Sequence, residues 1–119
     1  EAWRFLRDPT IAAYVTEALK TWRKKNAMVL LATQSGDDLQ RSELLRVALE
    51  SCPTRIFLAN PHVDQQACQE LFGLNETEAA RIATLVPRQE CLLTQPGVAR
   101  VLRLVTDPES AALFSAGTD

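Results

Sequence analysis

Residues 27–35 read Ala-Met-Val-Leu-Leu-Ala-Thr-Gln-Ser, and this stretch decides the fold class that we expect. Its first six residues form a continuous apolar run of strand length. Such a run is typical of a central parallel strand covered on both faces. A polar end follows at once, which places Gln34 at the tip of the predicted strand. In open α/β sheets this is the edge where ligands bind.

The residues before the run predict a helix. Asp8 and Pro9 form a helix start, with an acidic N-cap and a proline at the first helical position. Apolar residues then recur at helical spacing as far as Trp22. We expect the helix to end near Lys25 and Asn26, where cations suit its last turn.

The residues after the run alternate between predicted helices and strands. Helices are expected at residues 39–52, 63–71, 75–85 and 107–114, a strand at 55–59, and an antiparallel hairpin at 92–105. The order predicts an α/β fold with a mostly parallel sheet flanked by helices, right-handed crossovers and a late antiparallel hairpin.

Composition excludes several classes of protein. The net charge of -2, from 13 basic and 15 acidic residues, argues against a generally cationic nucleic-acid binder. Three widely spaced cysteines without a CxxC pattern argue against a disulfide framework or a zinc site. The single histidine, His62, cannot build a His-rich metal site. No segment approaches the roughly 18–20 apolar residues of a membrane span.

An ordered set of motifs identifies a resemblance. The segments EAW, WRKKN, ATQS, ESCPTRIFLAN and FGLNETE, followed by the hairpin, resemble the C-terminal part of the CagE/TrbE-type conjugal transfer ATPases of type IV secretion systems. The resemblance covers nearly the whole chain. It implies a RecA-like P-loop NTPase core, ATP hydrolysis with Mg²⁺ and homo-oligomers, often hexamers. The chain departs from the family's common FLPN at Ala59 and after Pro87-Arg88, which puts surface contacts in doubt more than nucleotide chemistry.

The chain itself is expected to be a piece of such a protein. It begins with Glu rather than Met, and no glycine-rich phosphate loop is present. We therefore expect residues 1–119 to form a single partial domain, the second half of the ATPase core, with the P-loop lying upstream. On its own the chain is expected to be inactive.

The resemblance assigns roles to four residues. Glu1 matches the glutamate after the Walker B aspartate and would position or deprotonate the attacking water. Gln34 would contact the γ-phosphate and report its state. Arg23 resembles an arginine finger, although a helix-end cation explains it, Lys24 and Lys25 equally well. Arg55 is a second arginine candidate for nucleotide binding, with a strand-end cation as the alternative. No residue is expected to bind the metal directly.

The expected function is that of an ATP-hydrolysing motor energising type IV secretion or conjugative transfer, cytoplasmic and peripheral to the inner membrane. Its partners would be further copies of itself and other secretion components. Two alternatives stay open, a DNA-translocating motor of the coupling-protein or FtsK type, and a non-catalytic oligomerisation remnant. The charge does not decide whether nucleic acid is a partner.

Overall fold

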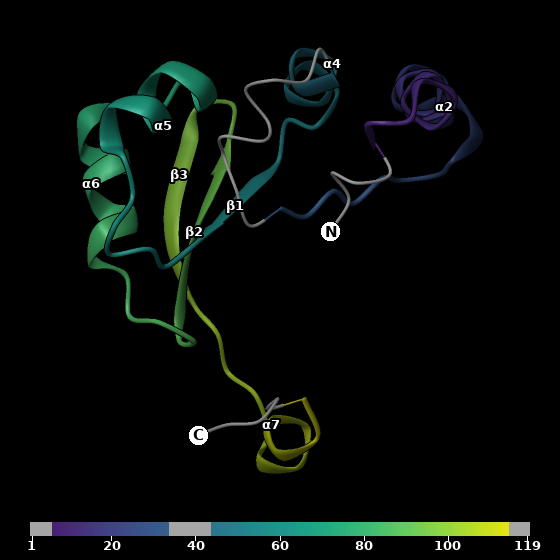
Figure 1. Ribbon diagram of the computed structural model, residues 1–119. Coiled ribbons are helices and arrows are strands. Elements are labelled where there is room, and N and C mark those ends of the chain that lie inside the picture. Colours follow the sequence, from purple (N-terminus) through teal and green to yellow (C-terminus); the bar gives the residue numbers. More distant parts are fainter. Residues whose placement is uncertain (1–5, 34–43, 115–119) are drawn as a thin grey trace. The chain divides into compact units, whose positions relative to one another are not determined.

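The computed structural model describes residues 6–33 and 44–114. The chain divides into two compact units, a first unit Glu1–Pro53 and a second unit Thr54–Asp119. Figure 1 shows the elements of each along the chain. The sequence predicts that residues 1–119 are one partial domain, the second half of an ATPase core. That assignment stays a prediction.

The helix predicted before the apolar run is confirmed. Helix α2 (Pro9–Thr21) begins after Asp8, whose carboxylate accepts hydrogen bonds from the backbone N–H of Thr10 at 2.8 Å and of Ile11 at 3.4 Å. A 3₁₀ turn, η1 (Trp22–Lys25), continues the helix. Asn26 ends it with a φ of 55°, a left-handed conformation that asparagine tolerates better than most residues. The expected end near Lys25 and Asn26 is therefore correct.

Helix α4 (Leu44–Ser51) covers the described part of the helix predicted at residues 39–52, while residues 39–43 lie outside the described residues. It contacts α2. Ala18 of α2 and Leu44 of α4 are the buried side chains of this pair. Each helix of the contacting pair therefore buries one apolar side chain.

The prediction of a strand at residues 27–33 is wrong for this structure. These residues carry no regular secondary structure, and all except the half-buried Val29 are exposed. A strand needs neighbouring strands to pair its backbone N–H and C=O groups. Among the described residues of the first unit there is no strand to supply them, so apolar composition alone does not produce one.

The second unit contains a three-stranded sheet of order β1-β2-β3, formed by β1 (Arg55–Leu58), β2 (Glu90–Gln95) and β3 (Val98–Arg103). Both pairs are antiparallel. Phe57 lies opposite Leu92, and Leu92 lies opposite Val101. The described sheet is therefore antiparallel, and the prediction of a mostly parallel sheet is wrong for these residues.

The connection between β1 and β2 explains this difference. It contains two consecutive helices, α5 (Gln65–Phe72) and α6 (Glu76–Thr84), rather than one. One helix returns the chain for a parallel strand, as in a βαβ unit. A second helix reverses the chain once more, so β2 enters the sheet antiparallel to β1.

The late hairpin is confirmed, and its turn follows from two residues. Gln95 pairs with Val98, so Pro96 and Gly97 form a two-residue connection. Proline fixes φ near -65°, and Gly97 has a φ of 77°. This combination is typical of a type II turn, whose third position requires a positive φ. The last predicted helix is also confirmed as α7 (Pro108–Phe114).

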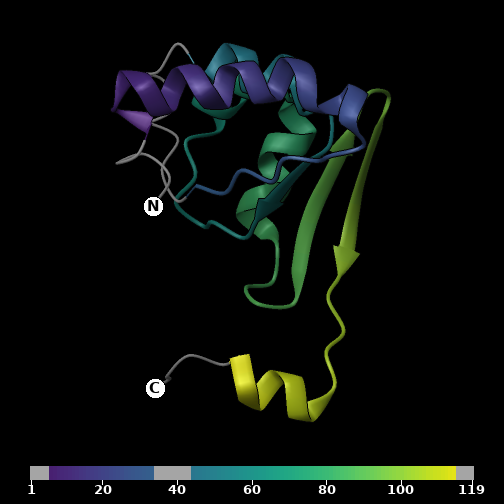
Figure 2. The same ribbon diagram turned by 90° about the vertical axis from the view of Figure 1, so that its right-hand side faces the viewer.

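Helices α5 and α6 cover one face of the sheet, which we call the inner face (Figures 1 and 2). The buried cluster consists of Leu74, Ile82, Leu85 and Leu92, with Phe57, Phe72 and Val101 among the residues packed against it. The Phe57 and Phe72 rings meet edge to face at 5.2 Å. On the opposite, outer face Ile56 is 57% exposed and Leu58 67% exposed. The buried cluster of the second unit therefore lies on the inner face, and on the outer face Cys91, which lies opposite Leu58, is also buried.

Candidate functional site

Arg23 lies in a short turn that holds three consecutive cations, Arg23, Lys24 and Lys25, all of them exposed. The turn is fixed through Trp22. The Trp22 carbonyl accepts the Asn26 N–H and, at 3.2 Å, the Ala27 N–H. The Trp22 ring also packs edge to face on Tyr14, with centroids 6.2 Å apart. A held backbone with an exposed guanidinium can present that group to an anion.

The position of this turn also suits the simpler explanation. Helix C-termini carry partial negative charge, which cations near the last turn stabilise. Arg23, Lys24 and Lys25 all occupy such positions. The structure therefore places Arg23 where an arginine finger could extend, and the assignment of that role to Arg23 stays a prediction.

Arg55, the second arginine candidate, has a defined structural contact. It is half-buried at the start of β1, and its Nη1 donates a hydrogen bond to the carbonyl oxygen of Phe72 at 2.9 Å. Phe72 is the last residue of α5, where carbonyl groups lack helical partners. Arg55 thus joins the first residue of the sheet to the end of a helix. Its contact with a nucleotide stays a prediction.

Glu1 and Gln34, the two other predicted site residues, lie outside the described residues. Thr33, the residue before Gln34, is described and is exposed. Arg23 belongs to the first unit and Arg55 to the second. The roles of Glu1 and Gln34 therefore stay predictions.

The motif Phe72–Glu78 forms the corner between α5 and α6. Gly73 ends α5 with a φ of 66°, and Leu74 is buried. Asn75 and Glu78 form the predicted capping box: Asn75 Oδ1 accepts the Glu78 N–H at 2.8 Å, and Glu78 Oε2 accepts the Asn75 N–H at 3.1 Å. Both side chains accept hydrogen bonds from backbone N–H groups at the helix start, which have no partner within the helix. The motif is explained locally as a rigid corner.

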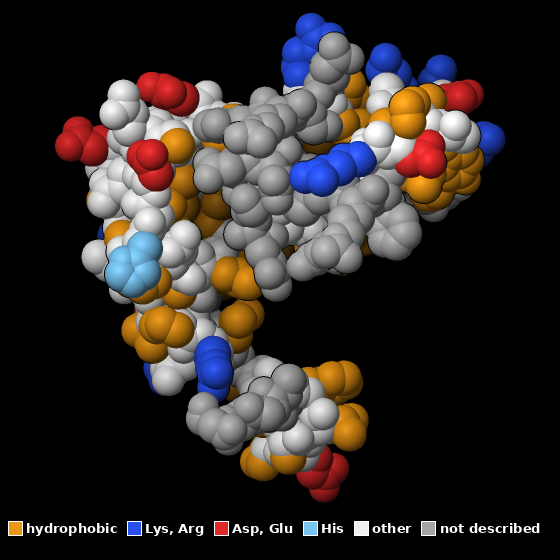
Figure 3. Space-filling view, in the orientation of Figure 1, with side chains coloured by type: hydrophobic (Ala, Val, Ile, Leu, Met, Phe, Trp, Pro, Cys, Tyr) orange, Lys and Arg blue, Asp and Glu red, His pale blue; other side chains and the backbone are white. Residues whose placement is uncertain are grey.

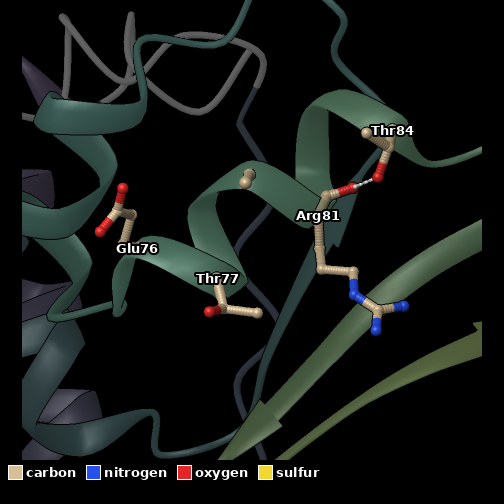
Figure 4. Close-up of a pocket in the computed structure, with 5 residues that line it drawn as sticks. Glu76, Thr77, Arg81 and Thr84 are labelled. Carbon is tan, nitrogen blue, oxygen red and sulfur yellow. Dashed lines mark hydrogen bonds between the residues drawn. The ribbon is translucent and has the colours of Figure 1, made fainter.

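A shallow depression of about 390 Å³ lies over α6, lined by Glu76, Thr77, Ala80, Arg81 and Thr84. Figure 4 shows the Arg81 guanidinium extending away from Glu76, while the Thr84 hydroxyl donates to the Arg81 carbonyl oxygen at 3.0 Å. The polar groups do not converge on one point. This depression therefore offers no catalytic arrangement.

Cys68, on α5, is a half-buried cysteine whose acidity its surroundings shift. Burial, and secondarily the nearby Asp64 carboxylate, raise the pKa of the Cys68 thiol. A thiol with a raised pKa is a poor nucleophile at neutral pH, because the thiolate is the reactive form. Cys68 thus acts as a packing residue beside the buried cluster.

The described residues also bear on metal binding and on membrane insertion. No group of three or more His, Cys, Asp or Glu side chains in residues 6–33 and 44–114 is placed to hold a metal ion. None of the helices in the same ranges is both long enough and apolar enough to cross a membrane.

Sequence reasoning missed the contact between Arg55 and Phe72. The two residues are 17 positions apart, and no local pattern links them. It also missed the depression over α6, where Thr77 and Arg81, four positions apart, lie on one side of the helix.

No protein-family model matches the sequence. Individual proteins do. The conjugal transfer protein TrbE of Rhizobium radiobacter is 34% identical over 98% of this chain, which corresponds to 14% of TrbE. The type IV secretion system protein CagE of Helicobacter pylori is 45% identical over 66% of this chain and 8% of its own length. The type IV secretion system protein virB4 of Bartonella quintana is 37% identical over 75% of this chain and 11% of its own length.

These matches confirm the resemblance that the ordered motifs indicated. The chain spans about one-seventh of the length of TrbE, so it corresponds to a limited part of such a protein. The matched part nevertheless includes nearly all of this chain, and several relatives share the same description. The chain belongs to the family of conjugal transfer and type IV secretion proteins that includes TrbE and CagE.

Proposed function

We propose that this chain is part of an ATP-hydrolysing motor that energises type IV secretion or conjugative transfer. The observation that carries the proposal is the match to TrbE over 98% of the chain, together with the motif order from EAW to the hairpin. In the complete protein the chain forms the second half of a RecA-like P-loop core. The antiparallel hairpin β2–β3 stands at the end of that core.

Each predicted site residue has one task in the proposed reaction. Glu1 positions the attacking water and accepts its proton. Gln34, at the end of the apolar run, hydrogen-bonds the γ-phosphate. Arg23 reaches the nucleotide of a neighbouring subunit and stabilises the charge that develops on the γ-phosphate. The exposure of Arg23 and the fixed backbone of its turn support this role.

ATP and Mg²⁺ are the ligands that this function needs. The exposed guanidinium of Arg23 has the planar fork that binds phosphate oxygens in pairs. Arg55 can contact the nucleotide only with donors other than the Nη1–H bound to Phe72, or after leaving that carbonyl. We propose that the protein ligands of the magnesium ion come from outside this chain.

The motor works as a homo-oligomer, which we propose to be a hexamer, because an arginine finger acts across a subunit boundary. Its other partners are components of the secretion system. We place it in the cytoplasm, peripheral to the inner membrane. A DNA-translocating motor and a non-catalytic remnant are the competing functions, and the experiment below separates them.

The test is steady-state ATP hydrolysis by the full-length parent protein and three variants. Glu1→Gln should lower turnover by about 10²–10⁴-fold while nucleotide still binds. Arg23→Ala should lower it by roughly 10³–10⁵-fold. Lys24→Ala is the matched control, since Lys24 shares the same exposed turn, and it should change turnover only slightly.

Three results would contradict the proposal. An inactive parent would favour the non-catalytic remnant. Strong stimulation by DNA would favour a DNA-translocating motor. Full activity of Glu1→Gln would show that another residue positions the water. The 119-residue chain alone should hydrolyse no ATP, because it contains no P-loop, and turnover by the rigorously purified chain would refute that expectation.

A further inference from the structure

Trp22, the residue before Arg23, is held both by its side chain and by its backbone. Its ring packs edge to face against the ring of Tyr14, with the centroids 6.2 Å apart. Its carbonyl oxygen accepts hydrogen bonds from the N–H groups of Asn26 and Ala27. Trp22 is half-buried, whereas Arg23 is exposed. An anchored residue and an exposed cation are therefore neighbours in the chain.

The bonds to the Trp22 carbonyl restrain the backbone from which Arg23 extends. The Trp22 C=O and the Arg23 N–H belong to one peptide group, and a peptide group is planar. Two hydrogen bonds to this carbonyl oxygen therefore restrain the orientation of the whole plane. The position of the Arg23 Cα, which lies in the same plane, is restrained with it.

Asn26 supports these bonds through its backbone conformation. Its φ of 55° and ψ of 32° lie in the left-handed region. A left-handed residue at the end of a helix directs its own N–H, and in the Schellman motif the next one, back to carbonyl groups of the last turn. Asparagine tolerates this conformation, glycine adopts it readily, and β-branched residues are outliers there. The residue type at position 26 therefore decides how well the Trp22 carbonyl is held.

Tyr14 holds the other part of Trp22 without belonging to a buried core. Its side chain is 64% exposed, so its loss should open no buried cavity. Tyr14 lies about two helical turns before Trp22, so the Trp22 ring folds back along α2 to reach it. Edge-to-face ring pairs have a preferred geometry, and this contact therefore limits the rotation of the Trp22 side chain.

The side chain of Arg23 carries any movement of this anchor to its tip. Figure 3 shows Lys and Arg side chains standing out from the surface around α2. A guanidinium at the end of a long side chain is displaced when its base rotates. A misplacement of about 1 Å can lower a catalysed rate by about 10²-fold. The contacts of Trp22 therefore bear directly on how well Arg23 can meet a reacting phosphate.

We propose that Tyr14 and Asn26 are positioning residues for Arg23, a role that rests on the proposed arginine finger. Both act through Trp22, Tyr14 on its ring and Asn26 on its carbonyl oxygen. An arginine finger stabilises charge that develops in the transition state. Loss of either contact should therefore lower kcat and leave the affinity for ATP unchanged.

The test compares disruptive with conservative substitutions in the full-length parent protein. Tyr14→Leu removes the ring but keeps a good helix former, and Asn26→Val disfavours the left-handed conformation. Each should lower kcat by about 10–100-fold, while equilibrium dialysis with a non-hydrolysable ATP analogue shows an unchanged dissociation constant. Tyr14→Phe keeps the ring and Asn26→Gly keeps the positive φ, so both should retain wild-type turnover. Ile11→Ala, a truncation on the same helix at a side chain 36% exposed, is the control and should also retain it.

A double-mutant cycle separates positioning of Arg23 from a general loss of structure. In the Arg23→Ala background, Tyr14→Leu should cause no further loss of activity, because no guanidinium is left to position. Single-turnover measurements with protein in excess over ATP follow the slow hydrolysis of this background. Circular dichroism of every variant establishes that its helix content is retained.

The outcomes decide the proposal in either direction. Normal kcat in Tyr14→Leu or in Asn26→Val overturns it, and the proposed motor then stands if Arg23→Ala is still impaired. An equal loss from Tyr14→Leu with and without Arg23 also overturns it, because Tyr14 would then act on another group. An inactive parent, or full activity of Arg23→Ala, overturns the arginine finger and this positioning role together. Loss in both disruptive variants, retention in both conservative ones and no further loss without Arg23 is the expected result.

Discussion

Replacement of Leu92 by alanine should destabilise the second unit more than the same truncation of Ile56 on the outer face of its sheet. Leu92 is 2% exposed in the central strand, between Phe57 and Val101 in register. It belongs to the cluster formed with Leu74, Ile82 and Leu85. Leu92→Ala leaves a cavity that the two flanking strands hold open. Ile56→Ala, on the outer face, removes a side chain that is already 57% exposed.

The expected magnitudes differ several-fold. A Leu→Ala change in a core costs about 2–5 kcal/mol, with the larger values where the site cannot collapse. Neighbours on both strands and two covering helices place Leu92 in the upper half of that range. For Ile56→Ala, a half-exposed side chain gives roughly 1 kcal/mol from lost apolar burial. Small domains are stable by about 5–15 kcal/mol, so Leu92→Ala removes a large share of the total.

Urea unfolding followed by far-ultraviolet circular dichroism measures both variants. Leu92→Val provides a milder substitution in case alanine prevents folding. Equal losses for Leu92→Ala and Ile56→Ala would show that the outer face is packed as tightly as the inner face. That result would refute the inference that the main buried cluster lies on the inner face.

Three further predictions rest on single contacts. Arg55→Ala should lower the free energy of unfolding by about 1–2 kcal/mol, as judged by urea titration, because the charged donor to the Phe72 carbonyl is lost; an unchanged midpoint would show that this contact is not structural. Burial disfavours the Cys68 thiolate, so the pKa of Cys68 should be higher in the folded chain than in the urea-unfolded chain. The rate of alkylation across pH, followed by mass spectrometry, measures both pKa values, and equal values would contradict the burial of Cys68. Hydrogen bonds from Ser110 lower the pKa of the Asp107 carboxyl in the folded chain. The cap should therefore stabilise α7 above the unfolded-state pKa of Asp107, and this stabilisation should be lost as the pH falls through its lower folded-state pKa. A carbon-detected titration that shows a raised pKa for Asp107 would exclude the cap.

Local signals predicted much of the fold. Asp8 with Pro9 marked the start of α2, and Asn75 with Glu78 marked the start of α6, because capping is decided by groups a few positions apart. The hairpin followed from a proline and a glycine at adjacent turn positions. Each of these features depends on residues that are close in sequence, so a single chain contains the information needed.

The relative direction of the strands could not be predicted from local sequence patterns. Whether β1 and β2 run parallel is decided by how the intervening helices turn the chain, which spans 31 positions between Leu58 and Glu90. Both helices between β1 and β2 were predicted, at residues 63–71 and 75–85, but local patterns do not give the direction in which each helix turns the chain. The apolar run at 27–33 shows the same limit, since composition indicates a buried strand and pairing partners decide whether one forms.

The two arginines predicted as site residues, Arg23 and Arg55, differ in exposure and in the contacts of their side chains. Arg23 stands in the turn that ends α2, whereas Arg55 begins β1 and contacts the last residue of α5. Both therefore meet a helix end, where carbonyl groups lack partners and cations are stabilised. Arg55 is half-buried and gives its Nη1–H to the Phe72 carbonyl, so any nucleotide contact must spare or break a bond that joins β1 to α5. Arg23 is exposed on a turn whose backbone is held through Trp22, and its side chain can extend without such a loss. A group that stabilises a passing transition state must be held at its base and free at its tip. Arg23 meets that requirement, and for this reason it is the arginine whose removal we expect to affect turnover rather than folding.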